Sequence, residues 1–143
     1  MRWTNLLLLS GLAVSQIASA AGHLEIEGAW IRTAPPGSMM LAGYATLRNS
    51  GDAPVTVTGA SSEAFGDVSL HESVEVDGVA RMKAIGAVEI APGATMLLAP
   101  GGKHLMLMRP KHDIEAGQKI TIRIATKSGD GAGAEFVVRD SAP

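Results

Sequence analysis

The strongest constraint on the fold is a series of short apolar segments broken by turn residues, with no sustained helical period. Residues 119–126 show the pattern well, because isoleucines alternate there with polar residues, as in a strand buried on one face. Clusters rich in Gly, Pro, Asn and Asp separate such segments, for example 34–38 and 49–52. We expect strands at 24–33, 44–48, 55–58, 68–74, 79–85, 95–98, 103–109, 119–126 and 135–139. Many short strands at roughly regular spacing favour an antiparallel β-sandwich or barrel, here in one domain.

The first twenty residues have the pattern of a cleavable secretory signal peptide. Arg2 provides a positive start, an apolar stretch covers 6–17, and the small residues at 18–20 match the site that signal peptidase reads. The apolar stretch is shorter than the ~20 residues of a membrane span. We therefore expect cleavage after Ala20 and a mature, exported domain over 21–143 that does not span the membrane; an uncleaved anchor is the alternative.

The composition argues against several classes of protein. Removing the predicted signal peptide takes away one basic residue, which leaves 11 basic and 14 acidic residues and a charge of 11 − 14 = −3. A mildly acidic chain with few aromatic residues is poorly suited to nucleic acid. The absence of cysteine excludes disulfides and the thiolate of a blue copper site. Without a thiol nucleophile or a Gly-x-Ser-x-Gly motif, the chain is not expected to be an enzyme.

Two histidines and two methionines form the candidate metal site: His71, Met82, His104 and Met106. Imidazole and thioether groups bind soft or borderline metals without a thiolate. A thioether is also neutral, so it needs no deprotonation and brings no charge to the site. Two groups of each kind would make a neutral ligand set suited to copper(I), a soft monovalent ion.

The segment from His71 to Met82 is predicted to form a β-hairpin. The Asp-Gly pair at 77–78 is a strong signal for a two-residue turn. Such a turn places Ser73 opposite Met82 and His71 opposite Ala84. Because side chains alternate along a strand, His71 and Met82 then share one face as diagonal neighbours, ~7–8 Å apart at the backbone.

The second pair of candidate ligands lies on another predicted strand. His104 and Met106 are two residues apart and so project from one face, while Leu105 and Leu107 point into the core. The glycines that precede His104 mark the entrance of the strand, where a ligand could be both fixed and exposed. The remaining methionines, Met39, Met40, Met96 and Met108, are expected to pack, with a supporting thioether role for the first three and a spare-ligand role for Met108 as the alternatives. His112 is expected to be an exposed loop residue.

The joint spacing is more specific than any one residue. His71 is followed by ten residues, Met82, twenty-one residues and then His104-x-Met106. This pattern resembles the signature of the PCuAC-type periplasmic copper chaperones. The blocks that also resemble the family are Ala29-Trp30-Ile31-Arg32, Pro35-Pro36-Gly37, Gly43-Tyr44, Gly78-x-x-Arg81-Met82 and Pro100-Gly101-Gly102-x-His104-Leu105-Met106-Leu107.

The resemblance implies a cupredoxin-like antiparallel Greek-key β-sandwich that binds one copper(I) through the four residues named above. It further implies a monomeric periplasmic chaperone that delivers copper for assembly of the copper-A centre of cytochrome c oxidase. The partner would be an oxidase subunit or a Sco-type protein. Copper storage or detoxification, and a protein-binding sandwich without metal, are the alternatives; a copper oxidase would be revealed by oxygen consumption.

The predicted mature N-terminus offers a second metal site. Cleavage after Ala20 would leave Ala21-Gly22-His23 at the start of the chain. A free amine, two backbone amides and a histidine in third place can surround copper(II) in the square plane that this ion favours. A chance histidine near the terminus is the alternative.

Overall fold

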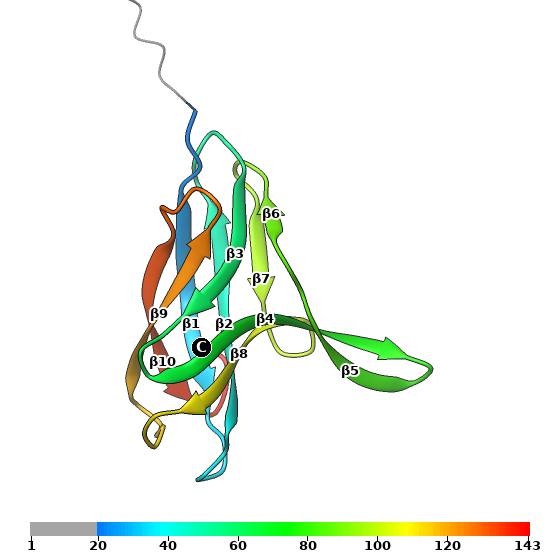
Figure 1. Ribbon diagram of the computed structural model, residues 1–143, viewed down its shortest axis with the longest axis vertical. Coiled ribbons are helices and arrows are strands. Elements are labelled where there is room, and N and C mark those ends of the chain that lie inside the picture. Colours follow the sequence, from blue (N-terminus) through cyan, green and yellow to red (C-terminus); the bar gives the residue numbers. More distant parts are fainter. Residues whose placement is uncertain (1–19) are drawn as a thin grey trace, which may run out of the picture.

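The computed structural model describes residues 20–143, so all of the predicted signal peptide except Ala20 lies outside the described residues. The described part consists of β-strands and connecting turns (Figure 1). The strands are β1 (Leu24–Arg32), β2 (Met40–Asn49), β3 (Val55–Ser61), β4 (Phe65–Val76), β5 (Val79–Ala84), β6 (Val88–Ile90), β7 (Thr95–Leu98), β8 (Lys103–Pro110), β9 (Lys119–Thr126) and β10 (Ala132–Arg139). The all-β prediction is confirmed. No helix of residues 20–143 has the length and apolar character needed to cross a membrane.

The strands pair in an order that differs from their order in the chain. Along the pairing path they run β5-β4-β8-β2-β1-β10-β9-β3-β6, and β7 pairs with β2 beyond the part that meets β8. Such crossovers are those of a Greek key, in which a later strand returns to lie beside an earlier one. The sandwich is therefore closed by pairings between strands far apart in the sequence.

One pairing departs from the predicted antiparallel arrangement. β1 and β10 run parallel, with Trp30 beside Val137 and Arg32 beside Arg139. Every other strand pair is antiparallel in the described part of the chain. Parallel neighbours need a long crossover between them, and here nearly the whole domain forms that connection.

The core lies inside the sandwich and is built by alternation within strands. In β9 the residues alternate strictly between exposed and buried, and Ile122 and Ile124 point into the core. Leu105 and Leu107 of β8 and Phe136 of β10 are fully buried in the same cluster. The prediction that Leu105 and Leu107 face the core is confirmed.

The structure lengthens the predicted strands β3, β4 and β10, and it differs from the prediction most at two other points. β2 begins at Met40, four residues before the predicted start, because its first residues pair with β8 although they do not alternate in polarity. β6 was missed because it has only three residues, Val88–Ile90, held in place by pairing with β3.

Asn49 holds together the turn that follows β2. Its side chain is completely buried and makes four hydrogen bonds. Its Oδ1 accepts from the backbone N–H groups of His23 (3.2 Å) and Gly51 (3.0 Å). Its Nδ2 donates to the carbonyls of Ala53 (2.7 Å) and Ile90 (3.0 Å). One amide thus joins the N-terminal segment, the turn and β6.

The β4–β5 hairpin extends away from the sandwich as an arm (Figure 1). All six residues of β5 are exposed, and the hairpin carries the exposed apolar side chains Val76, Val79 and Met82. Among residues 20–143, β5 pairs with β4 alone and forms one end of the pairing path. The arm therefore depends on β4 for its position.

Candidate metal centre

The register of the β4–β5 hairpin is the predicted one. Ser73 lies opposite Met82 and His71 opposite Ala84. The turn residues Asp77 and Gly78 have φ angles of 52° and 77°, the positive values that a type I′ turn requires at both positions. The hairpin therefore carries Met82 back toward the face that His71 occupies.

The two histidines are brought together by the pairing of β4 with β8. His71 lies directly opposite His104, and Ser69 lies opposite Met106. The imidazole ring centroids are 6.1 Å apart and the ring planes are inclined by 28°. Sequence reasoning paired residues only within the hairpin, and it did not identify this contact between β4 and β8.

A cavity of about 250 Å³ lies beside the histidine pair. Its lining contains one imidazole and three thioethers, together with small, apolar and polar side chains and one arginine. The lining residues are Arg32, Thr33, Ala34, Met40, Leu41, Ala42, Met82, His104 and Met106. Three of the four predicted ligands thus line one cavity, and the fourth, His71, does not line it but lies directly opposite His104.

His104 has a fixed tautomer. Its Nδ1 lies 3.0 Å from the carbonyl oxygen of Gly102, which can only accept, so Nδ1 carries the proton. The lone pair is then on Nε2, which is buried and has no hydrogen-bond partner within residues 20–143. A second group that binds one ring nitrogen and so orients the other is common among histidines that bind metals.

His71 also presents an unpaired nitrogen. Its Nε2 lies 3.0 Å from the Ser69 hydroxyl, which can accept a proton and so permits the tautomer with a lone pair on Nδ1. Nδ1 is buried without a hydrogen-bond partner in the described part of the chain. Burial, and then the neighbouring imidazole of His104, lower the pKa of His71, while Asp67 opposes them. A lowered pKa favours the neutral form of the ring, which is the form that can bind a metal.

The two predicted sulfur ligands differ in depth. Met106 is 8% exposed at the base of the cavity, whereas Met82 is 62% exposed on the arm. Within residues 20–143 no group of three or more His, Asp or Glu side chains could hold a metal ion. Any ion at this site would therefore depend on sulfur, which favours a soft ion over calcium or magnesium.

Several single-residue predictions can be checked against exposure. His104 was expected at an exposed strand entrance, but it is 3% exposed, because the strand begins at Lys103 and both of its faces are covered there. Met39 and Met40 were expected to pack, but both are exposed. The packing role of Met96 and the exposure of His112 are confirmed.

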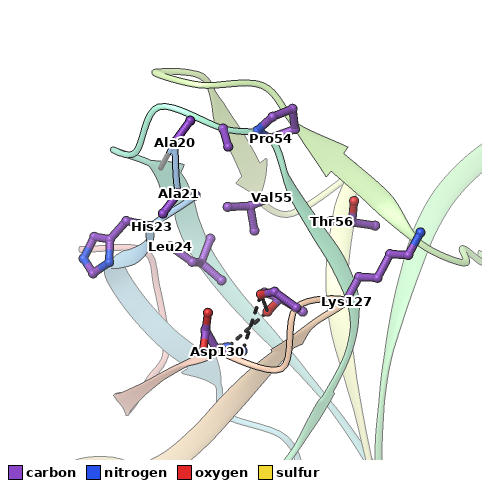
Figure 2. A pocket seen from close by; sticks show the side chains of 14 residues that line it. Ala20, Ala21, His23, Leu24, Pro54, Val55, Thr56, Lys127 and Asp130 are labelled. Atoms are coloured by element: carbon purple, nitrogen blue, oxygen red, sulfur yellow. Dashed lines mark hydrogen bonds between the residues drawn. The ribbon is translucent and has the colours of Figure 1, made fainter. Parts of the chain in front are cut away.

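Residues 21–23 lie at a second cavity, of about 550 Å³ (Figure 2). The His23 N–H donates to Asn49, and the Ala21 carbonyl accepts from the Asp52 N–H at 2.9 Å. In Figure 2 the His23 ring points away from the cavity and from Lys127 and Asp130. The copper(II) site at Ala21, Gly22 and His23 stays a prediction; it would need the His23 amide to leave Asn49.

The amino-acid sequence of the chain is similar to those of known proteins. Residues 24–138 match the family model "Putative lipoprotein LpqE-like". "Putative lipoprotein Lxx21020" of Leifsonia xyli subsp. xyli (strain CTCB07) is 37% identical over 142 residues, which cover 94% of this chain and 84% of that protein.

Solved structures resemble the chain in fold. The copper-bound PCuAC domain from PmoF2 is 21% identical with a TM-score of 0.66, covering 88% of this chain and all of that domain. CuI-DR1885 from Deinococcus radiodurans is 27% identical with a TM-score of 0.64, covering 80% of this chain and 76% of that one. The sandwich therefore has the cupredoxin-like fold of PCuAC domains.

Proposed function

The chain belongs to the LpqE-like lipoprotein family, and on this premise we propose that it carries copper(I) in the cell envelope. It binds a single ion and passes it to an acceptor protein, and it is a carrier rather than an enzyme. The proposed ligands are two imidazoles and two thioethers: His71, Met82, His104 and Met106. Outside the cytoplasm thiols tend to oxidise, so a ligand set without cysteine would keep its affinity for copper(I) there.

One observation carries this proposal. Two buried imidazole nitrogens, Nδ1 of His71 and Nε2 of His104, lack hydrogen-bond partners in the described part of the chain. An unpaired buried polar atom costs about 1–3 kcal/mol, and such atoms usually have a functional reason. His104 lines a cavity together with three thioethers, and His71 lies directly opposite His104, so a soft ion held between them would satisfy both nitrogens. Support also comes from DR1885, which was solved with copper(I) and is 27% identical to this chain.

The difference in depth between the ligands suits release of the ion. His104 and Met106 are buried and belong to β8, in the body of the sandwich. Met82 is exposed on the arm, where an acceptor's ligand can replace it first. All four ligands are neutral, so each exchange moves no proton.

The finer proposal is a periplasmic monomer that delivers copper to the copper-A centre of cytochrome c oxidase, directly or through a Sco-type protein. Storage of copper is the second candidate.

Anaerobic copper(I) titration against a competing chelator tests the ligand set. Loss of an outer-shell group typically costs about 10–100-fold in metal affinity, and a direct ligand should cost at least as much. We therefore expect Met106→Leu to lower affinity about 100-fold and Met82→Leu, at the more exposed position, about tenfold. Leucine nearly matches methionine in volume, so stability should change by less than about 1.5 kcal/mol. Met96→Leu, in the core, is the control, and wild-type affinity in both ligand variants would refute the assignment.

The pKa of His71 sets the expected pH dependence. Because burial and His104 lower this pKa below its usual value of 6.5, a proton competes weakly for Nδ1 at neutral pH. We expect copper(I) affinity to stay level from pH ~8 down to ~6.5 and to fall only at more acidic pH, as His71 becomes protonated. Chelator competition at several pH values would measure this. An affinity that already falls steeply between pH ~8 and ~7 would contradict it.

A further inference from the structure

The cavity at the candidate metal centre contains a third thioether that the proposed ligand set does not use. Met40, the first residue of β2, lines the cavity together with Met82, His104 and Met106. In the pairing of β2 with β8, Ala42 lies opposite Met106 and Met40 opposite Met108. Met40 is therefore on the same face as Met106 and is its diagonal neighbour, ~7–8 Å away at the backbone.

Packing does not account for Met40. Its side chain is 52% exposed, so a large part of its apolar surface remains in water. The small side chain of Ala42 stands between Met40 and the base of the cavity and leaves room for a long, flexible thioether to turn inward. The backbone next to Met40 is fixed, because the Arg109 N–H donates to the Met39 carbonyl at 2.8 Å. Met40 is thus a firmly anchored, unbranched sulfur side chain at the mouth of the cavity.

Met40 and Met82 reach the cavity from different parts of the fold. Met82 is carried by β5, which pairs only with β4 and contributes no buried residue. Met40 is carried by β2, which pairs with β8, the strand of His104 and Met106. Movement of the arm would withdraw Met82 from the cavity but leave Met40 in place beside His104 and Met106.

We propose that Met40 is a reserve ligand that replaces Met82 on the soft monovalent ion when the arm moves away. The Met40 sulfur donates a lone pair to the ion as the bond from Met82 breaks, so no electron or proton is transferred. The ion then keeps four protein ligands, because Met40 joins His71, His104 and Met106, and His71 is held opposite His104 by the pairing of β4 with β8. The side vacated by the arm is open to an acceptor. Silver(I), also soft and monovalent, should bind in the same way. This inference rests on the proposed function.

A double-mutant cycle on copper(I) affinity tests the reserve role. With Met82 present, Met40→Leu should change affinity by less than about twofold, since the reserve ligand is not needed. In a Met82→Leu background, Met40→Leu should lower affinity by about a further tenfold. Met39→Leu is the matched control: Met39 is also exposed, but alternation along the chain directs it away from Met40, and it does not line the cavity. In the Met82→Leu background it should have no effect.

Silver(I) titration of protein with 13C-labelled methionine methyl groups gives a second readout. The methyl resonance of Met40 should shift strongly in Met82→Leu and weakly in wild type, while that of Met39 stays fixed. The reserve role would be overturned if the Met40 resonance of Met82→Leu did not move while that of Met106 still responded, and if the effects of Met40→Leu and Met82→Leu on affinity were additive. Failure of the proposed function looks different, because then neither the Met82 nor the Met106 resonance of wild type would respond to silver(I).

Discussion

Replacing His104 with leucine is expected to lower copper(I) affinity by more than about 100-fold, the upper end of the losses seen when only an outer-shell group is removed. The imidazole is the most deeply buried of the proposed ligands, and its Nε2 lone pair is fixed in position by the bond from Nδ1–H to Gly102. Leucine fills a similar space but offers no lone pair. Chelator competition under anaerobic conditions would measure the loss.

The same substitution is expected to leave the apoprotein at least as stable as wild type. Leucine removes a buried nitrogen that has no partner within residues 20–143, which relieves about 1–3 kcal/mol. The Gly102 carbonyl loses one donor but keeps another, the Ser73 N–H at 3.1 Å. Chemical denaturation would measure the change, with the exposed His112→Leu as control. A variant that kept wild-type copper affinity, or that lost several kcal/mol of stability, would refute a ligand role for this nitrogen.

Asn49→Ala is expected to lower the free energy of unfolding by at least about 3 kcal/mol, since each buried backbone group left unpaired costs about 1–3 kcal/mol. The substitution removes partners from two N–H groups and two carbonyls, of which the Ile90 carbonyl is in the most buried bond. Some of the freed groups are only partly buried, and water can reach them. The total loss of stability is therefore smaller than four times the cost of one fully buried, unpaired group.

The copper(I) affinity of Asn49→Ala should equal that of wild type. Asn49 and Met40 lie at opposite ends of β2, 49 − 40 = 9 residues or roughly 30 Å apart. Ser50→Ala is the matched control, because its hydroxyl bonds only the exposed Glu25 carboxylate and its loss should hardly alter stability. Denaturation curves for both variants, followed by titration of the folded fraction, would separate stability from binding. Equal stability in the two variants would contradict the structural role of Asn49.

The parts of the site that depend on local geometry could be predicted from the sequence. The Asp-Gly turn at 77–78 determines the register of the hairpin, and both turn residues have the expected positive φ. Alternation along β8 likewise places His104 and Met106 on one face and Leu105 in the core. Both predictions require only the turn type and the two-residue period of a strand.

The parts that depend on distant strand pairing could not be predicted. Nothing local to His71 indicates that β4 pairs with β8, and this pairing alone brings His71 opposite His104. The same pairing pattern covers His104, which sequence reasoning expected to be exposed. Met40 was expected mainly to pack for a related reason, since a methionine at a strand start resembles a packing residue until the neighbouring strand is known. Spacing along the chain indicates which residues could be ligands, but the order of the strands in the sheet determines which of these residues lie close together.

The parallel contact between β1 and β10 has a consequence for how the molecule is made. Arg32 meets Arg139, so 139 − 32 = 107 residues must be in place before this pair can form. Contacts between such distant positions pay their loop-closure entropy early and make folding slow. The β1–β10 contact can therefore form only after synthesis of the chain has passed residue 139.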